Sequence, residues 1–261
     1  MTQPLGVVAA LVRRHDPDRF LTALFAPPDK RETLLTLYAF NHELARAREV
    51  ASQPMLALMR LQFWREVVDG AHRSHEVAAP LGAALDRGDL DRDELLGIIA
   101  GREAEAEASI PTLEEWRAYL LGTAGGLMVA AGRLLGVLGS ESLRLPGAAY
   151  GAAGVLRSVP ALARQGRCLL PEDLLAEHGL SPEAVIAAPT SAPVRAAIRQ
   201  LARTGQEFLA AGRGLRLSRQ AIAAALPAAL ARRDLHRLPM IHQRGITDRL
   251  AVLRAWVVGR L

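Results

Sequence analysis

Two segments of the sequence combine polar and charged side chains in an order that could carry chemistry. The first, residues 33–50, contains Tyr38 and Glu49, and the second, residues 151–174, contains Arg157. Guanidinium groups bind phosphate directly, and carboxylates bind hard divalent cations such as Mg²⁺. Phosphate or metal chemistry is therefore what these residue types offer.

Other motifs of catalysis or metal binding are missing from the sequence: it has no glycine-rich phosphate loop, nucleophile elbow, paired cysteines or His pair four residues apart. His72 and His75 stand beside an arginine in a polar helix end and are interpreted as surface groups. Cys168 has no histidine nearby in sequence and is interpreted as structural. Glu103 and Glu107 lie in an alternating acidic and alanine stretch, which indicates an exposed helix face.

The elements that must position these residues are helices, because apolar residues recur at helical spacing almost throughout and Pro and Gly separate the segments. Thr112 followed by Glu115 resembles a capping box that opens the longest apolar helix. Pro227 is expected to kink its helix. The expected helices are 30–50, one following Pro54, 77–85, 91–108, 112–138, 145–162, a short one from Pro171, 181–188, 192–211, 218–233 and 246–260.

The composition supports one all-α domain over residues 1–261. Half of the residues are apolar, and Ala, Leu and Arg, all good helix formers, dominate. The formal net charge is +5, yet the 32 basic residues include a single lysine, Lys30, and the arginines are scattered among acids. We interpret this pattern as a solvated arginine-rich surface, with no nucleic-acid partner.

The sequence also indicates a compartment. A single cysteine excludes an internal disulfide and fits a reducing environment. No basic segment precedes the short apolar stretch near the start, so no signal peptide is expected. Residues 122–140 are apolar but interrupted by Arg133, and they are expected to form a buried helix. The expected location is the cytoplasm, including the inner face of the membrane.

Four segments resemble squalene and phytoene synthases in the order in which that family carries them. They read TLLTLYAFNHELARAREV (33–50), LMRLQFWREVVDGA (58–71), TLEEWRAYLLGTAGGLMVAAGRLLG (112–136) and GAAGVLRSVPALARQGRCLLPEDL (151–174). The resemblance implies an isoprenoid-synthase-type helical bundle around a central cavity. In the family's enzymes, aspartate-rich motifs on two facing helices hold Mg²⁺ ions that bind the diphosphates of two prenyl substrates.

The aspartates of both motifs are replaced in this sequence. In the first motif the expected Asp pair falls on Ala45 and Arg46, and only Glu49 keeps a carboxylate. In the second motif the acidic positions hold Ser158, Ala161 and Leu162. Such side chains cannot hold a hard divalent cation. We therefore expect no catalytic residue, no metal site and no cofactor; Mg²⁺ would be needed only if the protein were an enzyme after all.

The resemblance implies a vestigial substrate pocket whose polar lining is retained. The residues expected to line it are Tyr38, Asn41, Glu49, Gln62, Arg65, Arg102, Glu105, Arg157, Gly166 and Arg167. In an alternative interpretation, Arg157 and Arg167 pair with Glu49, Glu103 or Glu105 in a purely structural network.

One branch of the family matches the departures as well as the retained residues. AFNHELARARE, LMRLQFWRE and the Arg102–Glu103 pair are similar to the mitochondrial assembly factor of respiratory complex I and its bacterial relatives, which also lack the aspartates. This resemblance implies an inactive protein that assists assembly of an inner-membrane complex by binding protein or lipid. Two alternatives stay open: a prenyltransferase that condenses two prenyl diphosphates at an altered Mg²⁺ site, and an isoprenoid or lipid carrier.

The last helix raises the question of membrane contact. Its segment, ITDRLAVLRAWVVGRL, places Trp256 and several apolar residues where they could meet a membrane interface. We expect Leu250, Leu253 and Val257 to pack into the core instead, and peripheral membrane contact stays the alternative.

Overall fold

The computed structural model describes residues 5–49, 53–107, 109–212, 214–240 and 243–260. Over these ranges the chain is all-α, as expected, and β structure is confined to two isolated bridges, Ile110 to Pro171 and Arg216 to Arg260. The α-helices are α1 (Val7–His15), α2 (Pro17–Ala23), α3 (Pro28–Glu49), α4 (Pro54–Val68), α5 (Ala78–Asp86), α6 (Arg92–Arg102), α7 (Leu113–Leu120), α8 (Gly126–Leu134), α9 (Arg144–Arg164), α10 (Glu172–Glu177), α11 (Pro182–Ala187), α12 (Ala192–Ala211), α13 (Leu226–Arg237) and α14 (Ile246–Val258).

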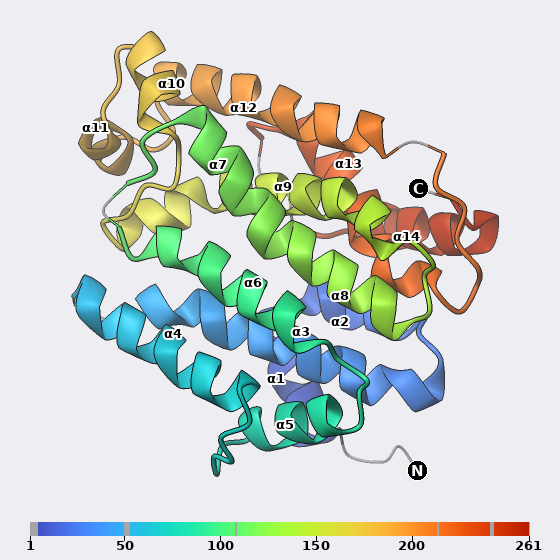
Figure 1. The fold of residues 1–261 in the computed structure, drawn as a ribbon. Coiled ribbons are helices and arrows are strands. Elements are labelled where there is room, and N and C mark those ends of the chain that lie inside the picture. Colours follow the sequence, from blue (N-terminus) through green and yellow to red (C-terminus); the bar gives the residue numbers. More distant parts are fainter. Residues whose placement is uncertain (1–4, 50–52, 108, 213, 241–242, 261) are drawn as a thin grey trace.

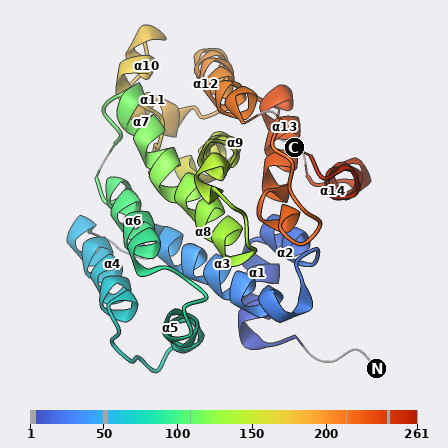
Figure 2. The ribbon, with the colours of Figure 1, turned by 45° about the vertical axis from the view of Figure 1, so that its right-hand side comes forward.

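Helix α9 lies at the centre of the bundle, with the other long helices around it (Figures 1 and 2). It packs against α12, α13 and the π-helical turn Leu121–Gly125, which joins α7 to α8. Gly147 of α9 permits this approach: a Cβ added there would lie 2.6 Å from the carbonyl oxygen of Ala124 and 2.9 Å from Cα of Gly125. The small residues of both segments thus bring the two backbones together.

The predicted helix 112–138 is present as α7, the π-helical turn and α8 in succession. Thr112 caps it as expected, because its hydroxyl accepts a hydrogen bond from the N–H of Glu115 at 3.1 Å. Most of α8 is buried, as predicted for this apolar stretch. In the part of the chain that the structure describes, no helix combines the length and the apolar character needed to cross a membrane.

Two predicted helices differ from those observed. Helix α13 begins at Leu226, so Pro227 lies in its first turn and produces no kink. A proline is tolerated there because its missing N–H would have no intrahelical acceptor. Helix α6 ends at Arg102 and continues only as the 3₁₀ turn Glu103–Glu105, so the prediction of a helix to residue 108 was too long; residues 50 and 108 lie outside the described part.

Helices α1 and α2 were not predicted. Asp16 separates them and caps α2, since its carboxylate accepts a hydrogen bond from the N–H of Arg19 at 3.0 Å and Pro17 occupies the first turn. This Asp-Pro start signal is readable in the sequence. Helix α1 packs against α3, so these two helices bring further polar residues to the face of α3.

Helix α14 contradicts the expectation that its apolar residues pack into the core. Leu250, Leu253 and Val257 are 55%, 42% and 56% exposed. The opposite face of the helix makes the contact with the bundle: Val252 is fully buried, in a cluster with Ile222, Leu226 and Leu230. The prediction of a helix here is confirmed, but the prediction of its buried face is wrong, because the helix packs through Val252.

Candidate functional site

An open cavity of about 280 Å³ lies between α3 and α9 and is bordered by residues from the α1–α2 junction, α6, α7 and the chain after α9. Its polar wall is formed by His15, Asp16, Arg19, Asn41, His42, Glu49, Arg102, Glu105, Tyr119, Thr123, Tyr150, Ser158 and Arg167. Leu120, Val155, Leu162 and Leu169 provide an apolar wall. This cavity is where both sequence motifs meet.

The two degenerate motifs contribute to the cavity from its two principal helices. Ala45 and Glu49 come from α3, and Ser158 and Leu162 come from α9. Arg46 lines a different hollow and pairs with Glu43 at 3.2 Å. Three of the positions at which motif carboxylates were expected therefore lie on the cavity wall, and they carry a methyl group (Ala45), a hydroxyl (Ser158) and an isobutyl group (Leu162).

A buried hydrogen-bonded network forms one side of the cavity. Arg102 donates hydrogen bonds to the carboxylate of Glu105 and, at 2.9 Å, to the side-chain oxygen of Asn41. The phenol of Tyr119 donates to the same Glu105 oxygen at 2.6 Å. Burial opposes the charge on Arg102, but the carboxylate of Glu105 outweighs it and raises the pKa of the guanidinium. The ion pair joins α6 to the 3₁₀ turn that follows it.

Arg167 completes this network from the chain after α9. Its Nη2 atom lies 3.7 Å from Oε2 of Glu105 and has no hydrogen-bond partner among the described residues. Gly166 precedes it with φ +68°, a left-handed conformation that glycine adopts most readily. The turn at Gly166 therefore returns the chain to the cavity and sets Arg167 beside Glu105.

A second arginine is held at the α1–α2 junction. Arg19 donates a hydrogen bond to Asp16 at 2.7 Å and lies over the rings of Tyr150, 4.7 Å from its centroid, and Tyr38, at 5.7 Å. Burial opposes its charge, yet the carboxylate of Asp16 raises the pKa of Arg19. Burial also raises the pKa of Tyr150, so both phenols face the guanidinium as neutral groups.

Two imidazoles stack beside these groups. The ring centroids of His15 and His42 are 4.5 Å apart, with an interplanar angle of 18°. Burial, together with the neighbouring His15, lowers the pKa of His42 below its ordinary value. Its Nε2 atom is buried and has no hydrogen-bond partner in the described part of the molecule. His42 is therefore held in its neutral form at neutral pH.

The cavity does not fit the Mg²⁺ cluster that the synthases of the family use. Asp16 and Glu105 are both paired with buried arginines, and Glu49 is exposed at the end of α3. No group of three or more His, Cys, Asp or Glu residues suited to a metal ion occurs in the described ranges. A hard cation would have to displace guanidinium groups from their carboxylates, so the donor set opposes its binding.

The cavity brings together five of the ten residues predicted to line a pocket, namely Asn41, Glu49, Arg102, Glu105 and Arg167. Tyr38 lies beneath Arg19, and Gly166 acts only through the turn. Gln62 is exposed on α4, and Arg65 pairs with Glu103 at 2.6 Å; neither contributes to the cavity wall. Gln62 and Arg65 are about one turn apart on α4, which lies in the outer layer beside α3 and α6, and both side chains therefore point away from the cavity.

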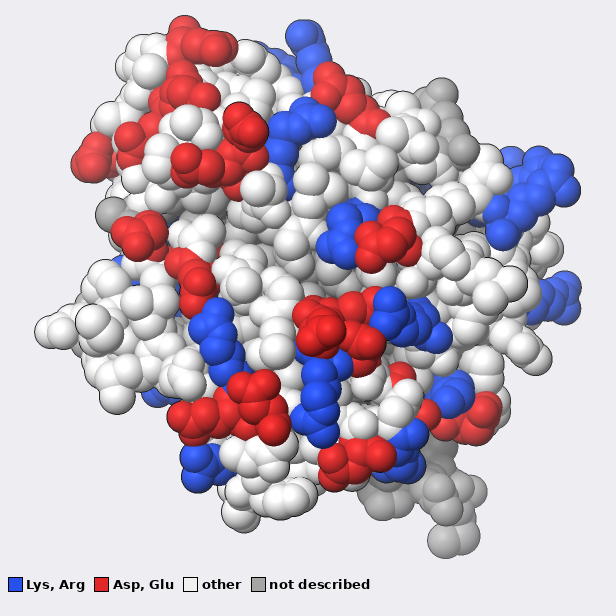
Figure 3. All heavy atoms as spheres, in the orientation of Figure 1, with Lys and Arg blue, Asp and Glu red and all other residues white. Residues whose placement is uncertain are grey.

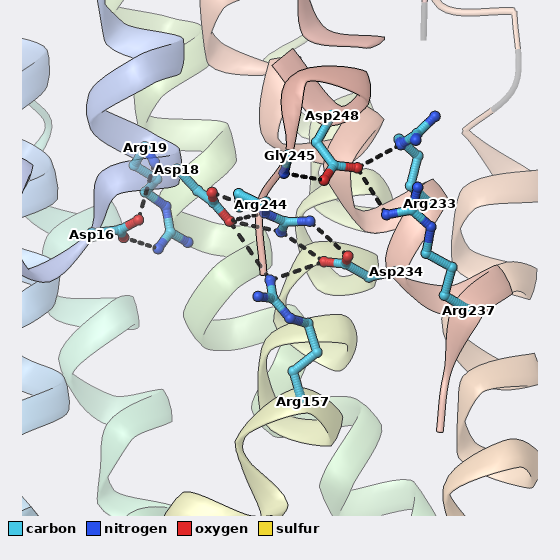
Figure 4. Close-up of polar contacts among 10 residues, drawn as sticks. All are labelled: Asp16, Asp18, Arg19, Arg157, Arg233, Asp234, Arg237, Arg244, Gly245 and Asp248. Atoms are coloured by element: carbon cyan, nitrogen blue, oxygen red, sulfur yellow. Dashed lines mark hydrogen bonds and ion pairs between the residues drawn. The ribbon is translucent and has the colours of Figure 1, made fainter. Parts of the chain in front are cut away.

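Arg157 also lies outside the cavity, contrary to both interpretations of its role. It pairs with Asp234 at 3.1 Å and Asp18 at 3.7 Å, while Arg244 binds the same two carboxylates (Figure 4). Burial opposes the charge of Arg244, and the two aspartates raise its pKa. This four-residue cluster ties α2, α9, α13 and the chain before α14 together. The alternative pairing proposed for Arg167 with Glu105 is, by contrast, observed.

Several cavity residues were not anticipated: His15, Asp16, Arg19, His42, Tyr119, Thr123 and Tyr150. The first three follow from the missed α1–α2 junction, for which the Asp-Pro pair was the available signal. The others stand on predicted helices, but only the packing shows which faces of those helices turn inward.

The fold defined by this cavity and its two facing helices is that of isoprenoid synthases. The structure is similar to a dehydrosqualene synthase solved with a ligand, with TM-score 0.78 and 14% identity over 96% of this chain and 94% of the other. It is also similar to squalene synthase HpnC from Alicyclobacillus acidocaldarius, with TM-score 0.73 and 19% identity over 89% and 91% of the two chains. At such low identity the likeness shows the fold.

The chain belongs to the squalene/phytoene synthase family, whose model matches residues 12–256. Its curated relatives include NADH dehydrogenase (ubiquinone) complex I, assembly factor 6, from Bos taurus, 30% identical over 181 residues that cover 66% of this chain and 54% of the relative. The Homo sapiens protein is 28% identical over the same shares. The chain spans about half the length of these relatives. The predicted resemblance to this branch is confirmed.

Proposed function

We propose that this chain is a catalytically inactive squalene/phytoene synthase-like protein that assists the assembly of an inner-membrane respiratory complex. The observation that carries the proposal is the replacement, on the cavity wall, of the motif carboxylates by Ala45, Ser158 and Leu162. The names of the relatives, assembly factor 6 of NADH dehydrogenase complex I, support the assembly role. The protein acts from the cytoplasmic side, by contact with a protein subunit or with lipid of that membrane.

The buried ion pairs support the loss of catalysis. In a synthase that depends on Mg²⁺, carboxylates must be free to bind the metal and the metal must bind diphosphate. Here Arg102 and Arg19 occupy the carboxylates of Glu105 and Asp16. The cavity is thereby neutralised by its own side chains, which favours a structural or binding role for it.

The assembly role is tested by deleting the gene and measuring the amount of assembled complex I and the NADH oxidation rate of isolated membranes. We expect both to fall and to recover when the wild-type chain is restored. Normal levels of active complex in the deletion strain would refute the assembly role.

Inactivity is tested separately, by incubating the purified chain with farnesyl or geranylgeranyl diphosphate and Mg²⁺. We expect neither pyrophosphate release nor an extracted hydrocarbon, while an active synthase run in parallel gives both. Turnover would establish the prenyltransferase alternative and direct the search for metal ligands to Glu49 and Glu105.

A lipid or isoprenoid carrier is the second candidate, and the apolar wall of the cavity favours it. Leu120, Val155, Leu162 and Leu169 face a polar wall that contains Arg102 and Arg167, an arrangement that suits a chain with an anionic head. Mass spectrometry of an organic extract of the purified protein would reveal a bound lipid. An extract without lipid from a well-folded sample would count against the carrier.

A further inference from the structure

Helix α14 presents an apolar stripe to the surface of the molecule. Ile246, Leu250, Leu253 and Val257 are 76%, 55%, 42% and 56% exposed, and their spacing of four, three and four residues places them on one side of the helix. Figure 2 shows α14 at the edge of the bundle, beyond α13. Four large apolar side chains in one row are more than the scattered exposure of single residues that soluble surfaces show.

The buried side of α14 is well fixed, so the exposed stripe belongs to a rigid helix. Asp248 accepts hydrogen bonds from Arg233 at 2.7 Å and Arg237 at 2.9 Å, both on α13. Burial favours its protonated form, but the N–H of Gly245 and these arginines hold the pKa of Asp248 at about 2. The ring of Trp256 contacts that of Phe25, with centroids 5.4 Å apart. The stripe is therefore presented on a preformed helix.

Positive charge surrounds the stripe. At 100° per residue, Arg249 falls on one side of the row and Arg254 on the other, and both are exposed. The charge continues beyond the helix: residues 195–261 contain thirteen arginines and three acidic residues, whereas residues 1–194 contain 19 basic and 24 acidic residues. Two of these three acids, Asp234 and Asp248, are buried in ion pairs with arginines.

The space-filling view agrees with this separation of charge. Acidic side chains gather over the corner formed by α7, α10 and α11, and arginines project from the opposite edge, where α14 lies (Figure 3). The acids in the first turns of those helices are Glu114, Glu115, Glu172, Asp173 and Glu183. The surface around α14 therefore favours a negatively charged partner.

We propose that α14 docks on an anionic phospholipid surface, with the stripe in the headgroup–acyl boundary and Arg249 and Arg254 against lipid phosphates. A single convex helix at the edge of the bundle fits a plane, and an apolar row flanked by arginines is the pattern of interfacial helices. A second copy of the chain is disfavoured, because a two-fold interface would bring identical arginines together. The proposal deepens the function proposed above by naming the surface for membrane contact, although its charges and exposures stand independently.

The test is co-sedimentation of the purified chain with vesicles of phosphatidylglycerol and phosphatidylcholine in equal parts, compared with phosphatidylcholine alone. We expect binding to the anionic vesicles only, and weakening as salt is added. Arg249→Gln/Arg254→Gln should reduce binding roughly 10- to 30-fold, and Leu250→Ser/Leu253→Ser at least about tenfold.

Matched control variants show whether vesicle binding depends on the stripe itself or only on the overall charge and the overall exposed apolar surface of the protein. Arg199→Gln/Arg203→Gln removes the same charge from exposed positions of α12, and Met55→Ser/Met59→Ser removes exposed apolar side chains of α4. We expect each control pair to change binding less than about threefold. Because every substituted side chain is exposed, we expect all four variants to fold, and circular dichroism checks this.

Three outcomes overturn the proposal: no sedimentation with anionic vesicles, equal binding to neutral vesicles, or equal losses in the stripe variants and their controls. Absence of vesicle binding combined with crosslinking of α14 to a protein subunit would assign the surface to a protein partner instead. Because the vesicle assay needs only the purified chain, its result is independent of the complex I levels that test the assembly role.

Discussion

Ala45 of α3 and Ser158 of α9 line the same cavity, at two positions where the family's synthases carry metal-binding carboxylates. The two facing helices are thus present, and at these two positions their side chains carry no carboxylate. The difference between scaffold and ligand set can be tested by restoring carboxylates to the scaffold.

The double variant Ala45→Asp/Ser158→Asp is expected to gain Mg²⁺ binding. Two carboxylates facing one cavity from α3 and α9 supply the oxygen ligands that Mg²⁺ prefers, and a cation bound only to the folded state stabilises it. Millimolar Mg²⁺ should raise the Tm of the variant by about 2–4 °C and leave that of the wild type unchanged, as followed by scanning calorimetry. The uncharged variant Ala45→Asn/Ser158→Asn is the control; an equal shift in it would contradict the prediction.

Replacing Glu105 with Gln should destabilise the fold strongly. The carboxylate is buried and is the anionic partner of Arg102 and Arg167, and removing one member of a buried ion pair costs about 3–5 kcal/mol. Glu103→Gln breaks the more exposed pair with Arg65 and should cost less than about 1 kcal/mol. Urea unfolding gives the free energy of unfolding of both variants. Similar losses would show that the buried network stabilises the fold no more than the exposed ion pair does.

Two glycines of α9 should respond to alanine in opposite directions. Gly147→Ala forces a Cβ to within 2.6 Å of the carbonyl oxygen of Ala124, so the helices must separate, at a cost of about 1–3 kcal/mol. Gly154→Ala meets no atom within 4 Å and should stabilise the helix by about 0.5–1 kcal/mol. Thermal unfolding of both variants checks the signs, and a stabilising Gly147→Ala would mean that the close contact is wrong.

Stability should fall as the pH is lowered through the range below about 6.5. The pKa of His42 is lowered in the folded state by burial and by His15, with Arg46 acting in the same direction and Asp16 and Glu43 opposing. The unfolded chain therefore binds more protons, and the contribution of neutral His42 is complete above pH 6.5 and is lost as the pH falls toward its folded-state pKa.

The pH dependence is measured by urea unfolding at pH 7.5 and 5.5. His42→Gln should reduce the difference between the two free energies, whereas His72→Gln, on the surface, should leave it unchanged. An unaltered difference in the His42 variant would assign the pH dependence to other groups.

How far the sequence could predict the structure differs between the elements and the site. Helical periodicity identified most helices, because apolar spacing depends only on local geometry. The face that each helix buries depends on its neighbours, and that information is not local. Leu250 and Leu253 were assigned to the core because their spacing fits a packed stripe, yet α14 packs through Val252 on the other side.

The polar site likewise combines residues that the sequence could place with residues that it could not. The cavity positions of Asn41, Glu49, Arg102, Glu105 and Arg167 could be predicted because the family resemblance fixes which helices enclose the cavity. Arg157 could not be placed in this way, because its partners Asp18 and Asp234 lie 139 and 77 residues away in sequence. The ion-pair partners of a long side chain on one helix depend on which distant helices pack beside it, and the sequence pattern does not give this information.

The separation of charge described for α14 also has a consequence before any contact is made. A body that is acidic at one corner, over α7, α10 and α11, and rich in arginine at the opposite edge has a permanent electric dipole. In the field above a negatively charged surface such a dipole experiences a torque that turns the arginine-rich edge toward the surface. The molecule would reach the surface with α14 facing it, so a larger fraction of encounters would lead to binding and the association rate would rise.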